Sequence, residues 1–154
     1  MPPGSKLPDT RPSLTAHVAD KAAKVREKYG PNFAQHELNL LLADRAYVRY
    51  PCRLSFDPAP LLPGEMAHPV ALGDRPEDGF VMHVHPRFAG QWERVVAAVL
   101  YQLVVVNYGG FASAQDAETF GAGVLGLSRD EYYHALCAMA DELGGSTGQG
   151  GGCS

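Results

Sequence analysis

Cysteine is scarce in this sequence of 154 residues. Its three cysteines, Cys52, Cys137 and Cys153, lie far apart and form no CxxC pair. A disulfide framework or a thiolate zinc site requires cysteines in even number or at short spacing. We therefore expect neither, and we interpret Cys52 and Cys137 as buried small apolar residues.

An excess of positive charge is also absent. The chain has 13 Lys and Arg against 17 Asp and Glu, which gives a net charge of −4 at pH 7. A protein that neutralises nucleic-acid phosphates needs clustered Lys and Arg. The composition therefore argues against a nucleic-acid partner.

Long hydrophobic runs are missing as well. The longest, from Val95 to Tyr101, ends at Gln102, whereas a transmembrane helix needs about 20 apolar residues. The opening residues, MPPGSKLPDTRPS, lack the apolar segment of a secretory signal. We expect a soluble, cytoplasmic protein with no membrane contact.

What the chain does contain is one strongly helical segment at residues 92–108, WERVVAAVLYQLVVVNY. Apolar residues recur there at three- and four-residue steps, and others lie outside this stripe, so the predicted helix is apolar on nearly every side. Such a helix is normally enclosed by the rest of its domain. Its two interior polar residues, Gln102 and Asn107, require hydrogen-bond partners if they are buried.

Proline marks the region that precedes this helix. Seven of the twelve prolines lie between Pro51 and Pro86, which excludes long helices there. Residues 47–56 alternate in polarity and predict a half-buried strand with Pro51 at an edge or bulge. Residues 66–72 and 80–85 predict two further strands, and the polar turn between them favours an antiparallel hairpin.

Four more helices are predicted on either side of these segments. Capping patterns indicate that they begin near Ser13 or Thr15, Asn32, Ser113 and Ser128. Residues 121–126, GAGVLG, spell GxGxxG but follow a helix rather than a strand, so we interpret them as a flexible connection.

Segregated strands flanked by helices predict an α+β fold. We expect a small antiparallel sheet of about three strands, packed against the central apolar helix with the other helices flanking it. One globular domain should cover residues 13–144, between a disordered lead-in at 1–12 and a flexible glycine-rich tail at 145–154.

His83-Val-His85-Pro86 is the one local pattern typical of a metal site. Two residues apart on a strand, both imidazoles project from the same face and can share one ion, for which zinc is the expected metal. A third ligand is required, and His68 on the neighbouring strand is the candidate. Alternation of polarity places His68 on the apolar side of its strand. If that side faces the core, His68 lies on the opposite face of the sheet from His83 and His85, unless a bulge at Pro69 reverses it.

The segment HVHPRF resembles the HxHP segment of the JAMM zinc isopeptidases, in which both histidines bind zinc. The resemblance implies a metal-dependent hydrolase with His83 and His85 as ligands. Those enzymes continue with a Ser and an Asp ligand, and the corresponding positions here are Glu93 and Val96, so the carboxylate ligand is missing.

Three arginines are candidates for an anion-binding patch. Arg49 and Arg53 share the polar side of the first strand, and a sheet that brought Arg87 near them would complete the patch. The alternative interpretation is a solvated sheet face.

Three functions are consistent with these observations. No catalytic constellation is complete, which favours a non-enzymatic binding or assembly module that meets a protein partner or associates with itself as a homo-oligomer. The first alternative is a metal-dependent hydrolase that uses His83 and His85. The second is a small-molecule-binding protein with a pocket between the sheet and helix 92–108, where Gln102 and Asn107 supply polar contacts. No cofactor is expected outside the zinc of the hydrolase.

Overall fold

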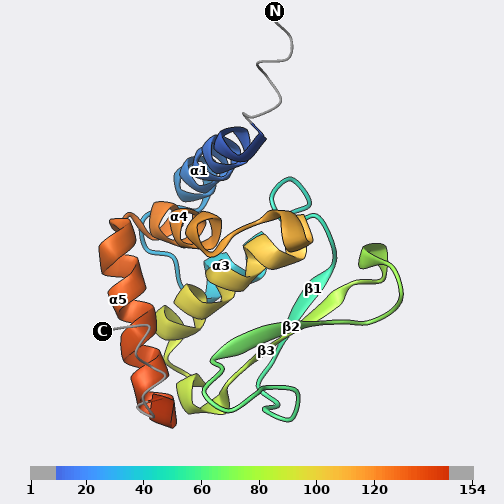
Figure 1. Cartoon of the computed structure of the whole chain (residues 1–154), viewed down its shortest axis with the longest axis vertical. Coiled ribbons are helices and arrows are strands. Elements are labelled where there is room, and N and C mark those ends of the chain that lie inside the picture. Colours follow the sequence, from blue (N-terminus) through green and yellow to red (C-terminus); the bar gives the residue numbers. More distant parts are fainter. Residues whose placement is uncertain (1–9, 146–154) are drawn as a thin grey trace, which may run out of the picture.

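The computed structural model describes residues 10–145. Over these residues the chain forms an α+β fold of five helices and a three-stranded sheet (Figure 1). The helices are α1 (Thr10–Tyr29), α2 (Gln35–Leu42), α3 (Trp92–Tyr108), α4 (Ala114–Leu125) and α5 (Arg129–Ala140). The strands are β1 (Cys52–Ser55), β2 (Ala67–Ala71) and β3 (Phe80–Val84).

Helix α3 is the centre of the fold and has the bounds that its periodicity predicts. It packs on β2 and β3 on one side and on α4 and α5 on the other (Figure 1). Enclosure is incomplete, because 43% of Val105 is exposed. The stretch Trp92–Phe111 is long and apolar enough to cross a membrane, but 56% of it is buried inside the fold. Since the core helix of a soluble protein has the same length and composition, this is weak support for a membrane span.

The sheet is mixed, with strand order β1-β3-β2. The predicted hairpin is confirmed, since β2 and β3 pair antiparallel. The expectation of a purely antiparallel sheet is wrong for β1, which runs parallel to β3. The reason is the long connection of residues 56–66 between β1 and β2. It replaces a tight turn, so the two strands do not pair with each other and β3 lies between them.

Strand β2 accommodates Pro69 without a bulge, because its register with β3 is regular through that residue. The main-chain bonds from His85 N–H to Met66 C=O and from Leu72 N–H to Gly79 C=O lie at the two ends of the hairpin. Bonded residues alternate in an antiparallel pair, so Pro69 is at a position whose N–H would point out of the sheet. Its missing donor therefore breaks no ladder bond, as is usual for proline in an edge strand.

The face of β2 that packs on the core is the opposite of the expected one. Ala67 is 1% exposed and Pro69 is buried, whereas alternation predicted that the side carrying His68 packs on the core. Leu72 is 54% exposed. Both sides of this strand carry apolar residues, so alternation alone pointed to the wrong face. The correction moves His68 to the outer face of the sheet.

The glycines of residues 121–126 belong to helix packing, which corrects their interpretation as a flexible connection. Gly121 and Gly123 lie inside α4. A Cβ atom at Gly121 would be 2.1 Å from Cζ of Tyr132, and one at Gly123 would be 2.7 Å from Cβ of Ala22. These two glycines therefore allow α5 and α1 to approach α4 closely. Gly126 ends the helix in the left-handed conformation, with φ of 72°.

Most helix ends follow their predicted caps. Ser113 and Ser128 each accept a hydrogen bond from the main chain at the start of α4 and α5. The second helix differs, because its capping residue is Ala34 and not Asn32. Helix α1 begins at Thr10, before the expected caps and inside the predicted lead-in. Residues 1–9 and 146–154, which hold the rest of the lead-in and nearly all of the tail, are outside the described residues.

Candidate functional site

A cavity of about 270 Å³ lies between the N-terminal end of β2, helix α3 and helix α5. Its apolar wall is formed by Met66, Ala98, Leu136 and Ala140, among other residues. Helix α4 contributes Glu118 at one side. The position matches the pocket predicted between the sheet and helix 92–108.

Gln102 is the polar residue of α3 that lines this cavity. It is half-buried, and its side-chain amide makes no hydrogen bond to any other residue that the structure describes. An amide offers two donors and a carbonyl oxygen. Gln102 therefore brings unused hydrogen-bonding capacity to the wall of an otherwise apolar cavity.

The remaining polar groups at the cavity are carboxylates and hydroxyls. Burial raises the pKa of the Tyr101 hydroxyl, and the nearby Glu118 and Tyr133 raise it further, so this group stays protonated. Glu65 accepts a hydrogen bond from the main chain of Leu62 at 2.9 Å, so part of its carboxylate is already engaged. Among the described residues, neither Lys nor Arg lines the cavity.

Asn107, the second predicted ligand contact, is not at the cavity. It is 7% exposed. Its Oδ1 accepts the main-chain N–H of Arg49 at 2.9 Å, and its Nδ2 donates to the carbonyl of Tyr47 at 2.8 Å. The amide thus ties the segment before β1 to the last turn of α3.

The three arginines of the predicted anion patch do not converge. Arg49 precedes β1 and Arg87 follows β3, and the parallel pairing of these strands puts the two residues at opposite ends of the sheet. The Arg49 guanidinium donates to the carbonyl of Asn107 and stacks over the ring of Tyr50. Arg53 is exposed between them.

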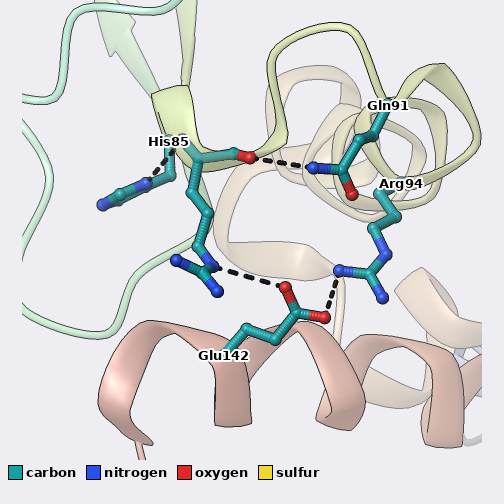
Figure 2. Close-up of polar contacts among 5 residues, drawn as sticks. His85, Gln91, Arg94 and Glu142 are labelled. Carbon is teal, nitrogen blue, oxygen red and sulfur yellow. Dashed lines mark hydrogen bonds and ion pairs between the residues drawn. The ribbon is translucent and has the colours of Figure 1, made fainter.

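Arg87 belongs instead to an ion-pair cluster with Arg94, in the first turn of α3, and Glu142, which directly follows α5 (Figure 2). Nε of Arg87 lies 3.3 Å from Glu142, and Arg94 contacts the other carboxylate oxygen. The hydrogen bond from Arg94 and then that from Arg87 lower the pKa of Glu142. Gln91 donates to the Arg87 carbonyl at 3.0 Å. Sequence reasoning did not identify Arg94 and Glu142, which are 48 residues apart and show no local pattern.

The three predicted metal ligands are only partly brought together. His68 and His83 are direct partners in the register of β2 and β3, so they share the outer face of the sheet. His85 follows the end of β3, and its Nδ1 accepts the main-chain N–H of Arg87 at 3.1 Å. Over residues 10–145, no three His, Cys, Asp or Glu residues are grouped closely enough to hold a metal ion.

The prediction that Cys52 and Cys137 are buried small apolar residues is confirmed only in part. Burial raises the pKa of the free thiol of Cys52 to about 11, so it is not a reactive thiolate. Cys137 is 5% exposed, as expected, but it is disulfide-bonded, which the sequence did not predict.

Comparisons with protein-family models, with curated proteins and with solved structures found no match to this chain.

Proposed function

We propose that this is a non-enzymatic binding protein whose cavity between β2, α3 and α5 takes a small, mainly apolar ligand with a hydrogen-bond donor at one end. The observation that supports this most directly is the side-chain amide of Gln102. Gln102 is half-buried and its amide makes no hydrogen bond to another described residue, so the amide is accessible to a group in the cavity. A ligand in the cavity would supply the partner.

The polar groups of the cavity favour a particular charge on that ligand. The Glu118 carboxylate is 18% exposed, and its nearest basic group is Nε of Arg129 at 3.6 Å. The protonated hydroxyl of Tyr101 and the amide of Gln102 are neutral. Because no described Lys or Arg lines the cavity, its field favours an ammonium or a neutral donor over a carboxylate.

The size of the cavity limits the ligand as well. Its 270 Å³ is slightly below the range of roughly 300–1,000 Å³ that is typical of drug-sized ligands. An aliphatic amine of about the size of an amino-acid side chain is therefore the best match. The predicted protein partner and the predicted metal-dependent hydrolase remain separate hypotheses, since none of the three histidines lines this cavity.

The test is a titration of the full chain with isobutylammonium and, separately, with isobutyrate, followed by ¹H–¹⁵N correlation spectra. We expect isobutylammonium to shift the side-chain amide of Gln102 and the main-chain amides of Ala98 and Ala140 saturably. Gln102→Leu should weaken this binding about fivefold, the effect of a hydrogen bond of about 1 kcal/mol. The matched control is Gln115→Leu, since Gln115 is exposed on α4.

Two results would contradict the proposal. Shifts that are absent, or that occur away from the cavity, would remove the binding site itself. Equal binding of isobutyrate would keep the site but refute the preference for an ammonium group.

A further inference from the structure

His68 and His83 lie opposite each other on the outer face of the sheet and do not line the cavity described above, although Glu65 beside His68 does. His68 of β2 and His83 of β3 form a pair that exchanges main-chain hydrogen bonds. The pairs Met66–His85 and Leu72–Gly79 at the two ends of the hairpin are bonded, and bonded pairs recur at every second residue. Side chains directly opposite each other in such a pair have Cβ atoms about 5 Å apart. The His68 side chain is 48% exposed, and His83 is half-buried, so both rings can be reached from solvent.

The Nδ1 atoms of both rings face oxygen atoms. Nδ1 of His83 lies 3.1 Å from the main-chain carbonyl of Asp57, and Nδ1 of His68 lies 3.5 Å from Oε2 of Glu65. A neutral imidazole that donates its Nδ1 proton to an oxygen leaves Nε2 with a free lone pair. Metal-binding histidines in proteins typically have this arrangement, because the oxygen that accepts the Nδ1 proton orients the ring and makes Nε2 more basic.

His85 has the opposite arrangement. Its Nδ1 accepts the main-chain N–H of Arg87 (Figure 2), so in the neutral ring the proton is on Nε2 and no lone pair is left for a metal. The HxH pattern of the sequence therefore does not describe the pair of rings that is ready to bind.

We propose that His68 and His83, and not His85, form a two-imidazole site for a divalent transition metal such as Ni²⁺, Cu²⁺ or Zn²⁺. Imidazole nitrogen is a preferred ligand of these ions. The described residues add no third ligand, so water fills the remaining coordination positions and the ion is exchangeable. Glu65, beside His68, adds a negative charge that favours a cation. The site does not depend on the ligand proposed for the cavity.

The test is calorimetric titration of the full chain with Ni²⁺, combined with thermal unfolding with and without the ion. His68→Ala and His83→Ala should each weaken Ni²⁺ binding at least about tenfold and abolish the rise in Tm that Ni²⁺ causes. The matched control His85→Ala should leave the affinity within about twofold of the wild-type value. Electron spin-echo spectra with Cu²⁺ should show two coordinated imidazoles in the wild type and one in each of the first two variants.

Two outcomes would overturn the proposal, and a third measurement controls for misfolding. If His85→Ala weakens binding as much as His83→Ala, the HxH pair is the site. If no variant changes the affinity, the protein holds an adventitious ion only. Unfolding in the absence of metal identifies a variant that fails to fold, and His68→Gln then replaces His68→Ala, because it removes the ligand and keeps a polar side chain on this half-exposed face.

Discussion

The two polar residues in the C-terminal half of α3 are Gln102 and Asn107, and they differ in how they are used. Asn107 is buried, and its amide bonds to the main chain of Tyr47 and Arg49. Gln102 lines a cavity and has no bond to any described residue. Both amides interrupt the same apolar helix, but only that of Asn107 is hydrogen-bonded to another described residue. We propose that the other serves a ligand.

Asn107→Ala should have the largest effect on this contrast. It removes two hydrogen bonds and leaves a main-chain N–H and a carbonyl without partners beside α3, which costs about 2–4 kcal/mol of unfolding free energy. Denaturant unfolding measures this loss, with the exposed Asn39→Ala as the control. A loss below about 0.5 kcal/mol would mean that water or a rearranged loop replaces the amide, and the contrast with Gln102 would fail.

Glu142→Gln tests the half-exposed ion pair between Arg94 of α3 and Glu142, which directly follows α5. The pKa of Glu142 is lowered mainly by Arg94, so its ionised form favours the folded state. This stabilisation is present above its ordinary pKa of about 4.3. It is lost as the pH falls through the lower pKa of the folded protein.

The expected result is a Tm below that of the wild type at pH 7, with the difference disappearing near pH 3. Thermal unfolding as a function of pH measures it, and Glu27→Gln on the exposed side of α1 is the control. A difference in Tm that does not change with pH would show that the carboxylate charge is not involved.

Gln102→Leu should have the smallest effect on stability. Because the side-chain amide makes no hydrogen bond to a described residue, its replacement by an apolar group of similar size should change the unfolding free energy by no more than about 0.5 kcal/mol. The same denaturant unfolding measures this change. A loss of more than about 1 kcal/mol would show that the amide already has a partner inside the protein, and the proposal for the cavity would lose its main support.

Features that depend on neighbouring residues were predictable from the sequence. The bounds of α3, the β2–β3 hairpin and the caps Ser113 and Ser128 all follow from periodicity or from contacts a few residues apart. The sequence also suggested a pocket between the sheet and this helix with Gln102 and Asn107 as polar contacts; Gln102 lines a cavity there, whereas Asn107 does not.

Features that depend on contacts between distant residues could not be predicted from the sequence. The partner of Asn107 is 60 residues away at Tyr47, and no local pattern distinguishes this amide from Gln102. The direction of β1 depends on where a long connection places it. The outer position of His68 was missed because both sides of β2 are apolar enough to be buried.

The sequence by itself determined the fold class, the central helix and the candidate residues, because helix periodicity, strand alternation and capping are written in short stretches of chain. Only the tertiary structure decided which candidates act together. It placed Gln102 at a cavity and Asn107 in a loop anchor, separated Arg87 from Arg49, and paired His68 with His83 in place of His85. The physical reason is that a hydrogen bond, an ion pair or a shared metal requires atoms within a few ångströms, and strand register and helix packing determine those distances.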